Sequence, residues 1–421
     1  MHGFSYRGNL LHAEDIPLTE IAERFGTPCY VYSHTALSDN WQAFSKGFAG
    51  RNATICYSVK SNSNLAVLSA LAQLGSGFDI VSGGELQRVL KAGGRAGKTV
   101  FSGVGKSEDE IRLALEAGVW SLNLESEAEF ERIEKVAGQL GTVAPISIRV
   151  NPDVDAVTHP HISTGMREAK FGIPISDAIR IYRQACARDC FRTVGIAVHI
   201  GSQITSMGPI LDALERVIDL AEQLHKDGVP IEHLDLGGGL GIQYRDEQPP
   251  QINEYCSEII RLFERRGCEL KIAIEPGRAI AASAGIFLTT VEFIKNAEAK
   301  NFAIVDGAMN DLIRPVLYDA WMDIVPVRLG NGTDEAIYDV VGPVCESGDF
   351  LGKDRSLAIR EGDLVAVRDA GAYGAVMSSN YNTRPRPPEI MVSGNRSDQV
   401  RARESIDQMF DLESIPERYR N

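Results

Sequence analysis

Eight short apolar runs rich in β-branched residues recur along the first two thirds of the chain, and each ends in a polar or glycine-rich turn. Helical patterns separate them; residues 107–117, for example, open with a serine and acidic residues that suit a helix N-terminus. Strands that alternate with helices pair in parallel through right-handed crossovers. Eight such units over about 220 residues favour a closed, TIM-type (β/α)8 barrel over an open doubly wound sheet. The runs are residues 53–60, 78–82, 99–103, 121–125, 145–152, 193–202, 233–239 and 271–277.

The pattern changes after Gly277, where strand-like segments are separated by Gly, Asn and Asp turns and long helical patterns are scarce. This texture predicts a mostly antiparallel β domain, a sandwich or a barrel. The N-terminal segment that ends in PCYVYS (28–33) is expected to join it. We therefore expect a barrel over 34–279 and a discontinuous β domain from 1–33 and 280–421, with a solvated helical tail over 397–420.

Composition narrows the class of protein. The chain has 43 basic and 57 acidic side chains, and its formal charge of −14 argues against a general nucleic-acid binder. The sequence contains no run of about 18 apolar residues, so it predicts no membrane span, and the first residues do not resemble a signal peptide. Seven cysteines without a C-x-x-C pair favour a reducing cytoplasm over a disulfide framework. His159 and His161 have no obvious partners, so no metal site is expected.

In a barrel, the side chains at the C-terminal ends of the strands face one common mouth. Lys60 ends the first run; it either extends to solvent or is a desolvated amine able to form a Schiff base. His199 follows an apolar strand, where a lone histidine is more often a buried structural residue than a catalyst. The strand ends are Lys60, Asp79, Ser102, Glu125, Arg149, His199, Gly237–Gly239 and Glu275.

Two further strand ends carry a glycine-rich turn and a glutamate. The turn GGGLG (237–241) is either a plain tight turn or a cradle whose backbone amides approach an anion. Its spacing is not that of a dinucleotide-binding fingerprint. Glu275 could form an inert ion pair with Arg278, or it could hold a proton on a heterocyclic nitrogen, with Gly277 adding an amide to the cradle.

These features together fit pyridoxal 5′-phosphate. This cofactor needs an amine for its aldehyde, an anion cradle for its phosphate and an acidic partner for its ring nitrogen, which makes the ring an electron sink. Lys60, the glycine turn with Gly277, and Glu275 supply the three.

At this point the sequence resembles a known family, the fold-type-III pyridoxal-phosphate decarboxylases, and most closely the branch that converts meso-2,6-diaminopimelate to L-lysine and CO2. The resemblance covers essentially the whole chain. It implies a barrel with a β domain and a homodimer. The motifs that carry it are YSVKSN (57–62), FDIVSGGEL (78–86), RVNPDVDAVTHPHISTGMREAKFGI (149–173), HIGSQI (199–204), DLGGGLGI (235–242), EPGR (275–278), MNDLIRPVLYDA (309–320), GPVCESGDFLG (342–352) and AGAYGAVMSSNYNTRPRPPEI (370–390).

The resemblance implies a role for each cofactor residue. Lys60 would bind the cofactor aldehyde covalently, His199 would stack on its ring, and Glu275 would pair with the ring nitrogen. The phosphate would be held by Ser202, Gly237, Gly238, Gly239, Gly277, Arg278 and Tyr373.

The resemblance also implies how the substrate is bound. Arg278, Arg314 and Tyr318 would bind a carboxylate, which suits the planar fork of arginine, and Tyr373 would also touch the substrate. The other subunit would donate Cys345 as proton donor and Glu346 as a substrate contact suited to the distal ammonium. One departure stands after Ala320, where the family often has Tyr and His and this chain has Trp321 and Met322.

Three alternatives stay open. A related decarboxylase would act on ornithine, arginine or carboxynorspermidine, although ornithine-type relatives typically have an aspartate after the cysteine, where this chain has Glu346. An alanine-racemase-like enzyme would usually have an arginine near the ring nitrogen, and Glu275 argues against that. A binding protein without turnover would be expected to have lost Lys60 or Cys345, and both are present.

Overall fold

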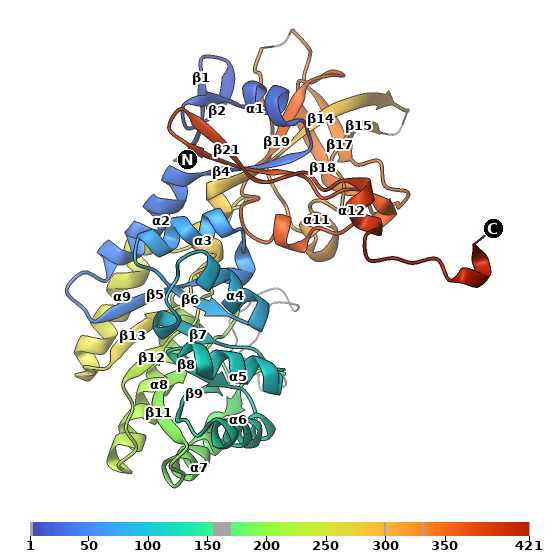
Figure 1. Ribbon diagram of the computed structural model, residues 1–421. Coiled ribbons are helices and arrows are strands. Elements are labelled where there is room, and N and C mark those ends of the chain that lie inside the picture. Colours follow the sequence, from blue (N-terminus) through green and yellow to red (C-terminus); the bar gives the residue numbers. More distant parts are fainter. Residues whose placement is uncertain (1–2, 155–169, 299, 331, 421) are drawn as a thin grey trace. The chain divides into compact units, whose positions relative to one another are not determined.

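The computed structural model describes residues 3–154, 170–298, 300–330 and 332–420, which divide into two compact units (Figure 1). One unit consists of residues 38–280 and the other of residues 1–37 with 281–421. Part of the RVNPDVDAVTHPHISTGMREAKFGI motif, including His159 and His161, lies outside the described residues.

Residues 38–280 contain a closed ring of eight parallel strands, which confirms the predicted barrel. Each strand pairs with the next in the ring, and the last returns to the first through the partners Ile272 and Ala53. A short strand, β10 (Ile173–Pro174), pairs with β9 outside the ring. The ring strands are β5 (Ala53–Ser58), β6 (Gly77–Ile80), β7 (Thr99–Phe101), β8 (Ser121–Leu124), β9 (Ala144–Asn151), β11 (Phe191–Ala197), β12 (His233–Asp235) and β13 (Lys271–Ile274).

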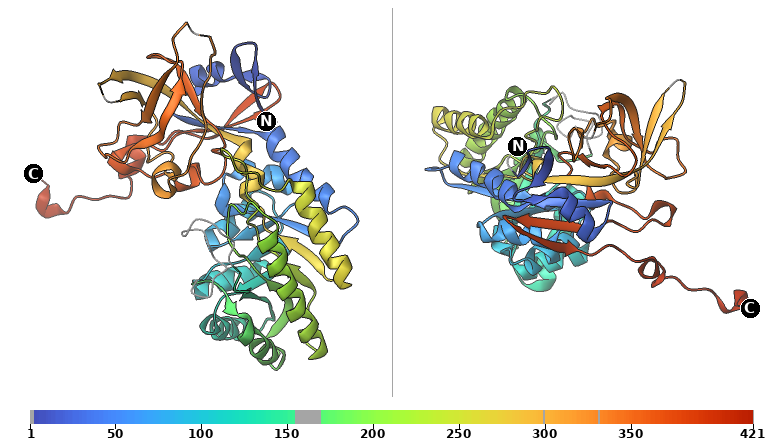
Figure 2. Two further views of the ribbon diagram at one scale, coloured as in Figure 1. Left: turned by 180° about the vertical axis from the view of Figure 1, so that it is seen from behind. Right: turned by 90° about the horizontal axis from the view of Figure 1, so that it is seen from above.

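Helices cover the outside of the ring, and α8 (green) and α9 (yellow) lie side by side there (Figure 2). The serine at 107 closes a capping box with Glu110 at the start of its helix, as the sequence pattern indicated. The helices of this part of the chain are α2 (His34–Gly47), α3 (Leu65–Gln73), α4 (Gly83–Lys91), α5 (Glu108–Ala117), α6 (Glu127–Leu140), α7 (Ile175–Cys186), α8 (Gly208–Lys226), α9 (Ile252–Arg266) and α10 (Arg278–Ala281).

Several ring strands end earlier than their sequence runs. β12 stops at Asp235 instead of 239, and β13 stops at Ile274 instead of 277. The residues beyond β12 leave the sheet because Gly237 and Gly239 have φ angles of 65° and 109°, in the left-handed region that strands do not use. Gly237–Gly239 and Glu275 therefore lie in loops that directly follow their strands.

The second unit is built on a mixed, mostly antiparallel sheet, as expected. Its longest strand, β14 (Gly285–Asn296), pairs antiparallel with β4, β15 and β19, while β4 pairs in parallel with β20. The remaining elements are β1 (Phe4–Arg7), β2 (Leu10–Ala13), β3 (Ile16–Pro17), α1 (Leu18–Phe25), β4 (Cys29–Ser33), β15 (Asn301–Val305), α11 (Arg314–Tyr318), β16 (Ile324–Pro326), β17 (Ala336–Val341), β18 (Phe350–Leu357), β19 (Leu364–Val367), β20 (Glu389–Ser393), β21 (Arg396–Arg401) and α12 (Ile406–Phe410).

The predicted helical tail is wrong for its first part. Residues 396–401 form strand β21, which pairs with β20 across a two-residue turn at Gly394 and Asn395. Gly394 has a φ of 59°, and a glycine at the first position of such a turn is a strong hairpin signal that the charged composition of the tail obscured. The five-residue helix α12 follows β21, and residues 411–420 are exposed.

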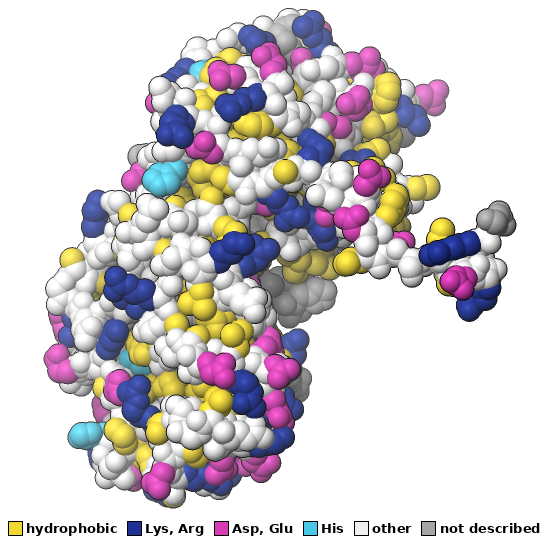
Figure 3. All heavy atoms as spheres, viewed as in Figure 1, with side chains coloured by type: hydrophobic (Ala, Val, Ile, Leu, Met, Phe, Trp, Pro, Cys, Tyr) yellow, Lys and Arg dark blue, Asp and Glu magenta, His cyan; other side chains and the backbone are white. Residues whose placement is uncertain are grey.

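On the face drawn in Figure 3, basic and acidic side chains are interspersed and do not gather in one patch. In the described parts of the chain, every helix is either too short or too polar to cross a membrane.

Candidate active site

Lys60 lies in a 3-10 turn, Val59–Ser61, directly after β5. The turn is fixed by the Ser61 hydroxyl, which donates to the carbonyl of Ser58 at 2.8 Å. The Lys60 amine forms an ion pair of 2.6 Å with Asp79, a fully buried residue on β6 that also accepts a hydrogen bond from the Ser58 hydroxyl. The lysine therefore does not simply extend to solvent: its amine is held at the mouth of the barrel by a buried carboxylate.

His199 lies just after β11, and its ring faces the glycine-rich turn. The amide of Gly238 donates to His199 Nδ1 at 3.2 Å, so the neutral ring carries its proton on Nε2. Burial holds the pKa of His199 well below its ordinary value, and the charges of Arg149 and Lys60 lower it further. His199 is therefore a neutral, flat ring, which suits stacking better than proton transfer.

The glycine-rich turn is packed too closely for any side chain. A Cβ at Gly238 would lie 2.3 Å from the carbonyl oxygen of Glu275, and a Cβ at Gly277 would lie 2.9 Å from the Cβ of Ser58. Within the described residues, the amides of Gly239 and Gly277 donate to no acceptor. These two amides remain available to an anion.

Gly237 and Gly238 do not fit the predicted cradle in the same way. The Gly237 amide donates to Asp235 Oδ1 at 3.0 Å, and the Gly238 amide donates to His199. The prediction that these amides bind an anion conflicts with these two hydrogen bonds. Both amides are used because the turn folds back on the end of its own strand and on the neighbouring strand end.

Glu275 follows β13 and is buried, with its Oε1 atom lacking a hydrogen-bond partner in the described part of the chain. Burial raises the pKa of this carboxyl well above its ordinary value, and the nearby carboxylates of Asp235 and Asp79 raise it further. A buried oxygen without a partner is costly. It fits a ligand that brings its own N–H to this position.

Arg278 begins the short helix α10 and is buried. Its guanidinium donates to the Tyr244 hydroxyl at 2.8 Å and to Ser202 Oγ at 3.1 Å. The structure therefore brings together two residues that the sequence assigned to the cofactor phosphate. It does not form the alternative ion pair between Arg278 and Glu275.

Several residues of this site had no assigned role in the sequence. Asp79 and Arg149 were noted only as strand ends; Arg149 forms an ion pair of 3.0 Å with Glu125. Tyr244, the partner of Arg278, has no sequence signal because it lies in an irregular loop. Asp235 did have a signal, since it directly precedes the glycines of the DLGGGLGI motif.

The other predicted site residues lie in the second unit. Arg314 is buried at the start of α11, where its guanidinium lies 3.7 Å from the sulfur of Met322. Tyr318 ends the same helix and is half-buried, as is Tyr373, which has a φ of 56° that is unusual for a bulky residue. The ring of Trp321 lies under the guanidinium of Arg355, at 4.4 Å. The two departures from the family pattern therefore have structural partners in their own unit.

Cys345 and Glu346 are exposed and lie between β17 and β18. The Cys345 amide donates to Asn382 Oδ1 at 3.1 Å, and Glu346 Oε2 accepts a hydrogen bond of 3.1 Å from the Tyr381 hydroxyl. The backbone of this loop is thus tied to residues 381–382, while the thiol and carboxylate remain at the surface.

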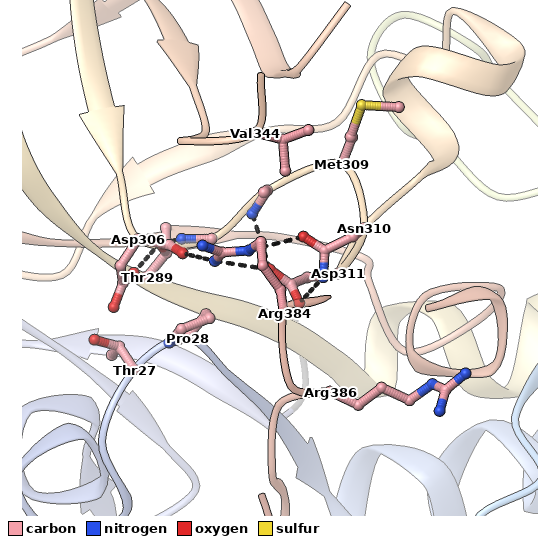
Figure 4. A network of polar contacts seen from close by, with 12 residues as sticks. Thr27, Pro28, Thr289, Asp306, Met309, Asn310, Asp311, Val344, Arg384 and Arg386 are labelled. Atoms are coloured by element: carbon pink, nitrogen blue, oxygen red, sulfur yellow. Dashed lines mark hydrogen bonds and ion pairs between the residues drawn. The ribbon is translucent and has the colours of Figure 1, made fainter. Parts of the chain in front are cut away.

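A polar network fixes the loops that carry these residues (Figure 4). The Arg384 side chain points toward Asn310 and Asp311. It donates to Asn310 Oδ1 at 3.0 Å, and its guanidinium lies 3.7 Å from the Asp311 carboxylate. The buried Asp349 accepts hydrogen bonds of 2.7 Å from the amides of both Met309 and Val344. The MNDLIRP and GPVCES motifs are therefore joined through one carboxylate.

The barrel fold agrees with the comparisons to known proteins. The family described as "Pyridoxal-dependent decarboxylase, pyridoxal binding domain" matches residues 35–282. The diaminopimelate decarboxylase of Pseudomonas aeruginosa is 55% identical over 417 residues, 99% of each chain. The crystal structure of diaminopimelate decarboxylase from Helicobacter pylori complexed with L-lysine has a TM-score of 0.91 at 40% identity and covers 94% of this chain and 99% of that one. The M. jannaschii enzyme in complex with L-lysine has a TM-score of 0.94 at 33% identity and covers 99% and 98%.

Fold and site define a pyridoxal-phosphate-dependent carboxy-lyase of fold type III. Within that class, the chain belongs to the diaminopimelate decarboxylase family.

Proposed function

We propose that this chain removes one carboxyl group of meso-2,6-diaminopimelate as CO2 and yields L-lysine, the last step of lysine biosynthesis. The observation that carries the proposal is the barrel site, in which an amine, a buried carboxyl oxygen without a partner and two open amides lie on neighbouring strand ends. Relatives of 55% identity over 99% of the chain carry this activity in their names, and two similar structures hold L-lysine, the expected product.

The residues present fit pyridoxal phosphate. Lys60 would bind its aldehyde, Glu275 Oε1 would accept the hydrogen bond of its protonated ring nitrogen, and the amides of Gly239 and Gly277 would bind its phosphate beside Ser202 and Arg278. Tyr373 would add a contact to the phosphate. When bound, the cofactor supplies an electron-withdrawing ring that stabilises negative charge left on the substrate carbon.

The chain's own residues would do the rest. The neutral ring of His199 would stack against the cofactor, and Asp79 would hold the Lys60 amine when that amine is released. Arg278, Arg314 and Tyr318 would bind the carboxylate that the substrate keeps, since guanidinium and carboxylate form paired hydrogen bonds. Glu346 would face the distal ammonium, and the Cys345 thiol would protonate the carbon that has lost CO2.

A panel of amino acids tests the substrate. The purified holoenzyme is incubated with meso-diaminopimelate, ornithine, arginine and carboxynorspermidine, and the released CO2 and the amine product are measured. We expect CO2 and L-lysine from meso-diaminopimelate alone. Release from ornithine or arginine, without release from meso-diaminopimelate, would replace this proposal with the related decarboxylase. Inversion of a stereocentre without CO2 would indicate a racemase.

The proposal includes a homodimer in which Cys345 and Glu346 enter the partner's site. Its support is the exposure of both side chains on a loop that hydrogen bonds hold in place. Mixing a Lys60→Ala variant with a Cys345→Ala variant tests it. If the cysteine acts across the interface, mixed dimers contain one intact site and activity recovers to roughly a quarter of wild type, since half of randomly assorted dimers are mixed. If the cysteine acts in its own subunit, no activity returns.

We also propose a cytoplasmic location. All seven cysteines are free, which suits a reducing compartment, although Cys186 and Cys345 are exposed enough to pair under oxidising conditions. Fractionation of cells that express the chain, followed by immunoblotting, checks this, and recovery in a secreted fraction would contradict it.

A further inference from the structure

Asp235 lies next to Glu275 for a reason that the strand register explains. Asp235 is the last residue of β12 and pairs with Ala273 of β13 in a parallel register. Glu275 follows directly after the end of β13, two residues beyond Ala273, so the two carboxyl groups belong to neighbouring strand ends. The Glu275 amide donates to the carbonyl of Gly237 at 2.7 Å, which holds the two strand ends together.

The carboxyl groups of Asp235 and Glu275 are close enough that each shifts the pKa of the other as a hydrogen-bonding neighbour. A carboxylate has no proton to donate, so this contact needs one proton between the two groups. Both groups are buried in the barrel, where two adjacent negative charges are costly. Burial raises the pKa of both groups; the neighbouring Asp235 raises the pKa of Glu275 further, whereas the contact with Glu275 lowers that of Asp235.

The surroundings of the two carboxyl groups differ. Asp235 accepts hydrogen bonds from the Gly237 amide at 3.0 Å and from Asn123 Nδ2 at 3.3 Å. The amide of Asn123 is itself oriented, because its Nδ2 donates to Ser102 Oγ and its Oδ1 accepts from Ser121. Asp235 is therefore the better placed group to be an anion while the pair is alone.

Glu275 has no comparable support, since its Oε1 lacks a partner in the described residues. In the pair alone, the shared proton belongs on Glu275. When a protonated ring nitrogen faces Glu275 Oε1, the better arrangement reverses, because Glu275 must then be the anion. Other charged or titratable groups that interact with this pair are Asp79 on β6, Lys60 after β5, the thiol of Cys56 on β5 and the hydroxyl of Tyr255 on α9.

We propose that Asp235 is a positioning residue that shares one buried proton with Glu275 and takes over that proton when the cofactor nitrogen occupies Glu275. In this arrangement the proton on Asp235 donates to Glu275 and fixes its negative charge toward the ring. The inference rests on the proposed role of Glu275 at the ring nitrogen. The shared proton depends neither on the identity of the substrate nor on the formation of a dimer.

The first test uses the cofactor-free protein and needs no turnover. Carboxyl groups labelled with 13C are titrated by NMR, and the Glu275 signal is assigned with Glu275→Gln. We expect wild type to keep one protonated carboxyl in the pair at neutral pH. Asp235→Asn removes the neighbouring charge and offers an N–H to Glu275, so the apparent pKa of Glu275 should fall by about one unit or more. An unchanged pKa would overturn the proposal.

Asp369→Asn is the matched control for this titration. Asp369 is buried as well, but it is not among the groups that shift the pKa of Glu275 or Asp235, so its substitution should leave the Glu275 signal in place. A shift of the same size in this control would mean that the titration reports general destabilisation, which would count against a shared proton.

The second test compares two replacements in the cofactor-loaded enzyme. Asparagine can donate to Glu275 as a protonated Asp235 would, while its oxygen still accepts from Gly237; alanine can do neither. We expect Asp235→Asn to keep kcat within about threefold of wild type and Asp235→Ala to lose at least about tenfold. Equal losses in both would refute the proton-holding role. If meso-diaminopimelate is not decarboxylated but the titration behaves as expected, the proposed substrate fails and this inference stands.

Discussion

The predicted site residues of the barrel and those of the second unit are held in different ways. In the barrel, Lys60 forms an ion pair with Asp79. Glu275 and Arg278 are buried, and Arg278 donates a hydrogen bond to Tyr244. In the second unit, Cys345 and Glu346 are exposed side chains. The backbone of their loop is held by hydrogen bonds from the amides of Val344 and Cys345 to Asp349 and Asn382. The barrel residues therefore have buried structural partners in addition to their proposed roles, whereas in the described part of the chain the only side-chain hydrogen bond of the exposed pair is that of Glu346 with the Tyr381 hydroxyl.

This difference teaches how each residue should respond to substitution. Removing a buried charged partner leaves the other charge unpaired, which costs stability in addition to any lost chemistry. Removing an exposed thiol leaves nothing unpaired in its own unit. Variants of the two regions should therefore separate stability from activity, and the following experiments can break or sharpen that separation.

The largest effect is expected from Lys60→Ala. It should abolish the visible absorbance of bound cofactor and lower kcat by about 10⁴-fold or more, since one amine both binds the aldehyde and moves protons. It should also lower the unfolding temperature, because Asp79 loses its cation. Lys135→Ala is the matched control: its ion pair with Glu108 has the same length of 2.6 Å but lies at the surface. A mass shift after borohydride treatment of Lys60→Ala would show that the cofactor binds elsewhere.

The next effect should be confined to activity. Cys345→Ser should lower kcat by about 10²- to 10³-fold, because a poorer acid replaces the thiol at the protonation step. Cofactor absorbance and unfolding temperature should stay at wild-type values. Cys186→Ser, which changes another exposed cysteine, should leave all three quantities unchanged. A fall in unfolding temperature for Cys345→Ser would contradict the expectation that substitutions in the exposed loop affect activity without affecting stability.

Much of the barrel could be predicted because its information is local. Each element or turn is indicated by residues within it or next to it: apolar runs indicate strands, capping serines such as Ser107 indicate helix starts, and the glycines after β12 indicate a turn. What the sequence could not supply were the pairings between distant segments. The use of the Gly237 and Gly238 amides, and the contact of Arg278 with Tyr244, depend on how loops fold back on the mouth.

The second unit was harder to predict for the same reason. The charged sequence of strand β21 predicts a solvated helix, because the hairpin signal at Gly394 is short. Trp321 and Met322, which depart from the family pattern, contact Arg355 and Arg314, respectively. Trp321 and Arg355 lie far apart in sequence, so no local pattern links them.

A third experiment uses pH. His233 is buried in the barrel against Trp120, and burial lowers its pKa to about 3. The folded barrel thus keeps His233 neutral, while the unfolded chain binds a proton below about pH 6.5. The stability of wild type should therefore fall as pH drops from about 6.5 to 3. His233→Gln should flatten this acid limb in urea unfolding, and the exposed His225→Gln should not. An equally steep limb in both would sink the assignment.

Buried carboxyls give the second unit the opposite dependence. Burial raises the pKa of Asp369 from 3.8 to about 6, so its protonated form is favoured in the fold. Its contribution is present below about pH 3.8 and is lost as pH rises through 6. Asp369→Asn should therefore make the unit gain stability near neutral pH relative to wild type, by an amount that vanishes in acid. The same urea series measures this, and a gain that persists at pH 3 would contradict it.

The smallest effect is expected from Trp321→Tyr, which restores the aromatic residue that the family often has. The guanidinium of Arg355 lies 4.4 Å from the Trp321 ring, and a cation over tyrosine is attracted less strongly than one over tryptophan. We expect the free energy of unfolding to fall by about 0.5–1 kcal/mol, with KM for meso-diaminopimelate unchanged. A large rise in KM without a loss of stability would place Trp321 against the substrate, and the second unit would then contribute a residue to specificity that neither its exposure nor its partner indicates.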